Sequence, residues 1–156
     1  MNLVTPQQFK RLFPLACSWA EEQETYILQN GTPLSESQIN DAILVPVTFP
    51  EKVRLLKVHQ VPWPENHELL LVGQKAGLIS DFTCGRTLGH GIFIRSDYWQ
   101  KRRLIIHELA HVAQYERLGG IRQFLEQYLQ ECLTVGYKNA PMEKEAKETA
   151  RRICGK

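Results

Sequence analysis

The stretch LIIHELAHVAQYERLGG, residues 104–120, constrains the fold of this chain more than any other segment. It has the length and apolar character of a buried helix, yet it carries two histidines and a glutamate. His107 and His111 are four positions apart, so a helix places both imidazoles on one face, about one turn apart. Burying such polar groups is costly unless they share a partner. The stretch therefore predicts a helix that brings these side chains together around a common ligand.

His107, Glu108 and His111 form the pattern HExxH. Two imidazoles with this spacing can both bind one Zn²⁺ ion at about 2.0–2.1 Å, and Glu108 flanks them, where it can act as a general base. The apolar residues around the motif lower the local dielectric, which strengthens the polarising effect of a metal. The pattern predicts a zinc metallopeptidase that hydrolyses peptide bonds of a peptide or protein substrate with a metal-activated water.

A catalytic zinc site needs a third protein ligand and one open position. No histidine follows His111, so this ligand must be a downstream glutamate or an upstream cysteine or histidine. The segment PMEKEAKETA, residues 141–150, is predicted to be helical and offers Glu143 and Glu145 among its glutamates. The upstream cysteine of interest is Cys84, within DFTCGRT.

A strand followed by HExxH on a central helix resembles the zincin metallopeptidases. Their glutamate-ligand branch, the gluzincins, takes its third ligand from a later helix, where it begins an ExxA pattern that EKEA at 143–146 matches. The resemblance implies Glu143 as the third ligand, with Glu145 as the alternative. At Lys147 those families usually have an aspartate that supports a histidine ligand, so that support must come from another group or be absent. Residues 50–150 also resemble small, uncharacterised bacterial zincin-like proteins.

Peptide deformylases also carry HExxH, and their third ligand is a cysteine on an upstream strand. This comparison keeps Cys84 open as a ligand, although its surroundings differ from the deformylase EGCLS stretch. A structural zinc site could also use Cys84 to close the fourth position, which makes a non-catalytic, zinc-stabilised binding module the alternative function. Glu108 favours the enzyme, because a structural site needs ligands and not a base. A metal-free helical interaction domain would require all three motif residues to be incidental.

Peptide hydrolysis also needs a donor that stabilises the oxyanion. Tyr137, just before the last predicted helix, is the predicted catalytic donor, and His90 and Tyr115 are the alternatives. Gln114 and Tyr115 follow the second histidine by three and four positions, near the metal face, where they could support the ligands. In zincins the edge strand before the motif helix, here 89–95, pairs with an extended substrate. Such pairing would make recognition partly independent of the substrate sequence.

The order of secondary-structure signals predicts an α+β fold and not βαβ alternation. Helical spacing dominates residues 1–49, strand signals occupy 50–96, and 97–156 is helical and holds the metal site. The length of 156 residues predicts a single domain. We expect a minimal zincin-like fold with N-terminal helices, a small sheet with an edge strand, the central HExxH helix and two C-terminal helices.

The element boundaries follow from caps, turn residues and spacing. Pro14 is expected to kink or restart the first helix. The predicted elements are helices at 6–30, 35–43, 97–118, 121–133 and 141–153, strands at 53–61 and 90–96, and a loop at 61–68, VPWPENHE.

Composition narrows the remaining function classes. A net charge of +2 without a basic, aromatic-containing stripe argues against nucleic acid as a partner. No apolar run approaches the roughly 20 residues of a membrane span. The start MNLVTPQQFKRLF lacks the apolar core of a secretory signal, which predicts a cytoplasmic location. The four cysteines form no CxxC pair, which argues against a zinc ribbon or a redox motif, and no pattern indicates an oligomeric state.

Overall fold

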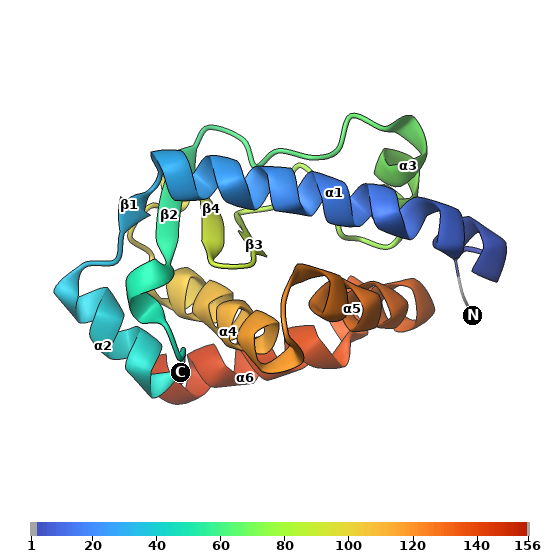
Figure 1. Ribbon diagram of the computed structural model, residues 1–156. Helices are drawn as coiled ribbons and strands as arrows, with labels where there is room; N and C mark the ends of the chain where they lie inside the picture. Colours follow the sequence, from blue (N-terminus) through green and yellow to red (C-terminus); the bar gives the residue numbers. More distant parts are fainter. Residues whose placement is uncertain (1–2, 156) are drawn as a thin grey trace.

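The computed structural model describes residues 3–155 and is an α+β fold, as predicted. Within these residues six α-helices surround one mixed four-stranded sheet with the order β1-β2-β4-β3 (Figure 1). β1 (Thr32–Pro33) is antiparallel to β2 (Arg54–Val58), and β2 is parallel to β4 (Gly91–Arg95). β3 (Gly85–Leu88) is antiparallel to β4 and forms the edge of the sheet.

The prediction that the strand before the HExxH helix is the edge strand is wrong. The segment predicted at 89–95 is β4, which lies between β2 and β3. Its sequence GIFIR is buried at the first four positions, and such an apolar strand is favoured where neighbours cover it. The shorter β3, with the exposed segment 80–82 preceding it, takes the edge position instead.

Helix α1 (Pro6–Asn30) covers one face of the sheet, and α4 (Arg102–Leu118) covers the other (Figure 1). Thr5 caps α1 through a capping box, as its position before a proline predicts. The helix continues through Pro14 without restarting. A proline removes one helical hydrogen bond, and the buried side chains before and after it hold α1 against the rest of the protein.

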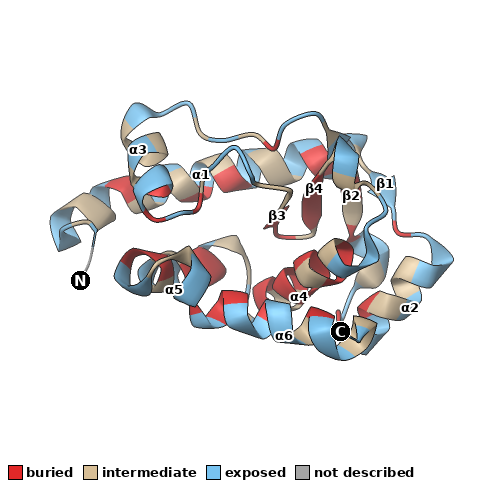
Figure 2. Cartoon of the chain, turned by 180° about the vertical axis from the view of Figure 1, so that it is seen from behind, coloured by how far each residue is buried: buried red, intermediate tan, exposed pale blue. Residues whose placement is uncertain are grey.

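Two apolar clusters form the core, one on each face of the sheet. Side chains alternate along β4, so Ile92 and Ile94 pack on the α4 side while Phe93 packs on the α1 side. A Cβ atom at Gly91 would lie 2.9–3.0 Å from side-chain atoms of Ile27, so this glycine lets α1 approach closely. Figure 2 shows the buried residues on β4 and on the inner faces of α1 and α4.

The remaining helices agree with the predicted positions to within two residues at each end, except at the start of α4. That helix begins at Arg102 and not near residue 97, because Gln100 has a left-handed φ of 82° that interrupts the helical conformation. A 3-10 turn, η2 (Ser96–Tyr98), occupies the intervening segment. The other predicted helices are α2 (Glu36–Leu44), α5 (Ile121–Val135) and α6 (Pro141–Cys154).

One helix was not predicted from the sequence. The loop predicted at 61–68 ends early, because α3 (His67–Lys75) begins within it. The side chain of Asn66 accepts a hydrogen bond from the backbone N–H of Leu69 and caps this helix. None of the helices within residues 3–155 has both the length and the apolar character required to cross a membrane.

Candidate metal centre

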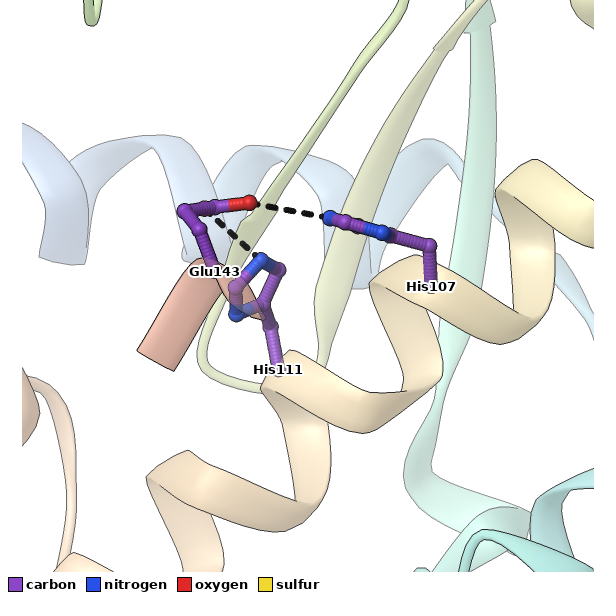
Figure 3. Close-up of side chains that lie close together, drawn as sticks. All are labelled: His107, His111 and Glu143. Atoms are coloured by element: carbon purple, nitrogen blue, oxygen red, sulfur yellow. Dashed lines mark hydrogen bonds and ion pairs between the residues drawn. The ribbon is translucent and has the colours of Figure 1, made fainter. Parts of the chain in front are cut away.

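Helices α4 and α6 bring the predicted metal ligands together (Figure 3). The Nε2 atom of His107 lies 3.0 Å from Glu143 Oε1, and His111 Nε2 lies 2.9 Å from Glu143 Oε2. Potential ligand atoms of the three residues all lie within 4.8 Å of one another. In the part of the chain from residue 3 to 155, these residues form the one such group of histidine, cysteine and acidic side chains.

The chemistry of these donors fits Zn²⁺. Two imidazole nitrogens and one carboxylate oxygen are a common ligand set of catalytic zinc sites and leave a fourth position for substrate or water. His111 Nδ1 lies 2.7 Å from the side-chain oxygen of Gln114, which can only accept. Nδ1 therefore carries the proton, and Nε2 is left to serve as the ligand atom.

Gln114 provides the support that the sequence left unassigned at Lys147. Its amide nitrogen donates to Met142 O at 3.0 Å and to Glu145 Oε1 at 2.6 Å, which orients its oxygen toward His111. Gln114 is almost completely buried, at 1% exposure. Glu145, the alternative third ligand, binds Gln114 and Arg117 and is not part of the ligand group.

Tyr128 of α5 holds the carboxylate of Glu143 and was missed in the sequence analysis. Its hydroxyl donates to Glu143 Oε2 at 2.6 Å. Burial and the neighbouring Glu143 raise the pKa of Tyr128 well above its usual value, so the hydroxyl remains a neutral donor. In the sequence Tyr128 belongs to an ordinary apolar helix pattern, and nothing in that pattern distinguishes its hydroxyl from that of a core tyrosine.

The pKa values of His111 and Glu143 move in opposite directions. Burial lowers the pKa of His111, but its hydrogen bond and charge contact with Glu143 dominate and raise it to about 9. Burial raises the pKa of Glu143, but hydrogen bonds from His107 and His111 hold it well below its usual range. In the metal-free protein at neutral pH the two therefore form a buried ion pair. Metal binding at this site competes with a proton on the imidazole.

Glu108 lies beside the ligand group but does not belong to it. This carboxylate is buried, and Thr87 of β3 donates its hydroxyl to Glu108 Oε1 at 2.8 Å. Glu108 Oε2 accepts no hydrogen bond from any residue between 3 and 155. A Cβ atom at Gly85 would lie 3.3 Å from the carboxylate carbon, so the glycine allows β3 to approach Glu108. A single threonine in a strand gives no sequence signal for this contact.

The three ligands, Glu108 and Tyr137 line one cavity of about 900 Å³. Tyr137, the predicted catalytic donor, is half-buried at the start of the 3-10 turn η3 (Tyr137–Asn139). Burial and the charge of Glu143 raise the pKa of its hydroxyl, which therefore remains protonated. Most other side chains on the wall are apolar, and many of these come from α1, α3 and α5, among them Phe13, Leu69, Val72, Phe124 and Leu133.

Other predicted candidates take different positions. His90 binds Glu116 at 2.9 Å and lies apart from the residues that line the cavity. Tyr115 does line it, but its hydroxyl donates to the main-chain oxygen of Thr87 at 3.0 Å. Cys84 also lines the cavity, yet its thiol donates to the main-chain oxygen two residues earlier and is not part of the ligand group.

No protein-family model, curated protein or solved structure matches this chain. The resemblance to gluzincins consequently rests on the motif residues themselves and stays a prediction.

Proposed function

We propose that this protein is a zinc-dependent metallopeptidase of zincin-like architecture that hydrolyses peptide bonds. One observation carries the proposal: His107, His111 and Glu143 converge on one point of a cavity wall, while the carboxylate of Glu108 lies beside them outside the ligand group. A hydrolytic site requires ligands and a separate base. A structural zinc site requires only ligands.

The protein groups have distinct roles in this proposal. Bound Zn²⁺ would lower the pKa of a water molecule toward about 7 and polarise the substrate carbonyl. Glu108 accepts the proton of the attacking water on Oε2 and delivers it to the leaving amine. The hydroxyl of Thr87 donates a hydrogen bond to Glu108 Oε1 and keeps this carboxylate oriented. Tyr137, with its neutral hydroxyl on the cavity wall, donates to the developing oxyanion.

The edge strand β3 offers a surface for an extended peptide. The N–H of Arg95 donates to Cys84 O at 2.8 Å, so antiparallel alternation turns the main-chain groups of Gly85 and Thr87 away from β4. The main-chain oxygen of Thr87 already accepts a hydrogen bond from the hydroxyl of Tyr115. The N–H and C=O of Gly85 remain for a ligand. Because Gly85 contacts Glu108, a peptide paired with it would run beside the base.

The test compares wild type with Glu108→Gln. Zinc per chain is measured by elemental analysis on untagged protein, and cleavage is followed with a library of quenched fluorescent peptides. We expect about one zinc per chain in both proteins. Cleavage should fall by about a hundredfold or more in Glu108→Gln, since the variant keeps the shape of the side chain and loses the base.

A second pair of variants tests the ligand assignment. Glu143→Gln should sharply weaken zinc binding, whereas Glu148→Gln, which alters an exposed carboxylate on the same helix, should not. Zinc binding without cleavage of any peptide would favour a non-catalytic, zinc-stabilised binding module. A chain that takes up no zinc even after reconstitution would refute the metallopeptidase proposal.

A further inference from the structure

Arg86 is a cation with unused hydrogen-bonding capacity on the wall of the metal-site cavity. Among residues 3–155 its side chain makes one hydrogen bond, from Nη2 to the main-chain oxygen of Leu78, and no ion pair. Its Nε–H is buried and has no hydrogen-bond partner. A guanidinium carries five N–H donors, and leaving a buried donor unpaired is unfavourable. The side chain is therefore suited to an acceptor that enters the cavity.

The position of Arg86 links it to the metal site. It is paired with Phe93 in the sheet, so its side chain leaves β3 on the face opposite to that of Thr87. The cavity extends around this edge strand and is lined by residues from both of its faces. Tyr137 and Cys132 are each within electrostatic range of both Arg86 and Glu143. Arg86 and the ligand group thus line the same cavity.

The surroundings of Arg86 favour a ligand that combines an anionic group with an apolar group. Most of the cavity wall near it is apolar, and the charge of a half-buried cation is screened less by solvent there than at the surface. Arg86 is the one partly buried arginine or lysine of the described wall. The other arginines and lysines on the wall are exposed: Lys101, Arg103, Lys138 and Lys147.

We propose that Arg86 binds a carboxylate of the substrate, and that the site therefore takes short peptides in which an apolar side chain lies next to that carboxylate. The guanidinium pairs with a carboxylate through two parallel N–H···O bonds, a geometry that an ammonium group cannot supply. The apolar side chain occupies the cavity. This assignment of a substrate class rests on the proposed peptidase function, but binding of the carboxylate requires no turnover.

The experiment measures probe binding by titration calorimetry in Glu108→Gln protein, with zinc and after its removal by a chelator. The probes are acetyl-Leu-Phe with a free C-terminal carboxylate, the same dipeptide as its amide, and acetyl-Glu-Phe amide. We expect an acidic probe to bind at least about tenfold more tightly than acetyl-Leu-Phe amide, with or without zinc. Comparison of the two acidic probes distinguishes a terminal carboxylate from a side-chain carboxylate.

Substitutions assign this preference to Arg86. Arg86→Gln should reduce the acid-over-amide ratio to about one, and Arg86→Lys should retain part of it. Lys147→Gln is the matched control, because it removes an exposed cation from the same cavity wall and should leave the ratio unchanged. Thermal unfolding and zinc content show whether each variant folds. If Arg86→Gln does not fold, the comparison of wild type with Arg86→Lys still tests the assignment.

The outcomes separate the two proposals. A preference that depends on Arg86 in a protein that cleaves no peptide would support carboxylate binding and count against hydrolysis. If Arg86→Gln lowered the affinity for all probes equally, the role of Arg86 would be structural and the carboxylate assignment would be overturned. A preference that requires zinc and persists without Arg86, or binding of no probe, would also overturn it.

Discussion

At the scale of single residues, Glu143 connects most of the candidate site. Its two carboxylate oxygens meet His107 and His111 at 3.0 and 2.9 Å, and Tyr128 donates to Oε2 at 2.6 Å. The ligand side chains therefore take positions near a common point before any metal binds. Such preorganisation reduces the entropy cost of metal binding, because few rotamers remain to be fixed.

Tyr128→Phe tests the support of Glu143. The substitution removes a hydrogen bond of 2.6 Å but keeps the ring, which stacks on Phe124 at 5.0 Å between centroids. We expect zinc affinity to fall by about tenfold to a hundredfold, the usual effect of removing a group that orients a ligand. Affinity is measured by competition with a chelator, and Tyr26→Phe, at an exposed tyrosine, is the control. Unchanged affinity would mean that Glu143 is held without Tyr128.

The candidate site was only partly predictable at this scale. HExxH and ExxA are local patterns, so His107, His111 and Glu143 could be selected from spacing. The contacts of Thr87 and Tyr128 depend on which strand and which helix pack against α4 and α6. Local spacing carries no information on such pairings. An isolated threonine and a tyrosine in an apolar pattern therefore looked the same as ordinary core residues.

At the scale of elements, most helices were predictable and the strand order was not. Helix signals such as the caps Thr5 and Ser35 act within a few residues. The order β1-β2-β4-β3 depends on contacts between distant segments, which is why β4 was wrongly placed at the edge. Helix α3 was missed because its nine residues directly follow a proline-rich segment, which is typical of a loop.

Gly91→Ala tests the packing of α1 against β4. The new methyl group would lie 2.9–3.0 Å from the Cβ and other side-chain carbons of Ile27. Because Gly91 belongs to β4 and Ile27 to α1, and the two elements are packed together, neither residue can move away freely. We expect the free energy of unfolding to fall by about 1–3 kcal/mol, as for overpacking in other cores. Denaturant titration measures this change. In an Ile27→Ala background the same substitution should cost less, and equal costs in both backgrounds would exclude the clash as the cause.

The ion pair between Arg11 of α1 and Glu68 of α3 gives a pH-dependent contact between elements. Hydrogen bonds from Arg11 and Gln8 lower the pKa of Glu68 to about 2. The folded pKa is below the unfolded value of about 4.3, so the contact stabilises the protein above that pH and is lost as the pH falls through about 2. The difference in Tm between wild type and Glu68→Gln should be small at pH 6, because both groups are solvent-exposed, and should vanish near pH 2. A difference that persists at pH 2 would show another role for Glu68.

At the scale of the whole molecule, α1 and α5, which are far apart in the sequence, close one apolar cluster between them (Figure 1). Cys17 of α1 and Cys132 of α5 both lie in that cluster and are fully buried. Cys84 and Cys154 are partly exposed. Burial raises the pKa of Cys17, and it raises that of Cys132 to about 12, so neither thiol supplies much thiolate in the folded state.

Thiol reactivity therefore reports how the molecule opens. In native protein at pH 8, a thiol-specific reagent should modify Cys84 and Cys154 quickly, and Cys17 and Cys132 only through transient unfolding. Because both buried thiols lie in one cluster, we expect the same opening to expose them at the same rate. If the protein binds zinc in its folded state, as proposed, zinc should slow the modification of both thiols by the same factor, which grows with zinc concentration above its Kd. Modification is followed at each cysteine by mass spectrometry of digested samples, with denatured protein as the reference in which all four react. If zinc slowed the modification of Cys132 alone, the helices around the metal site would open separately from α1, and the cluster would not be one cooperative unit.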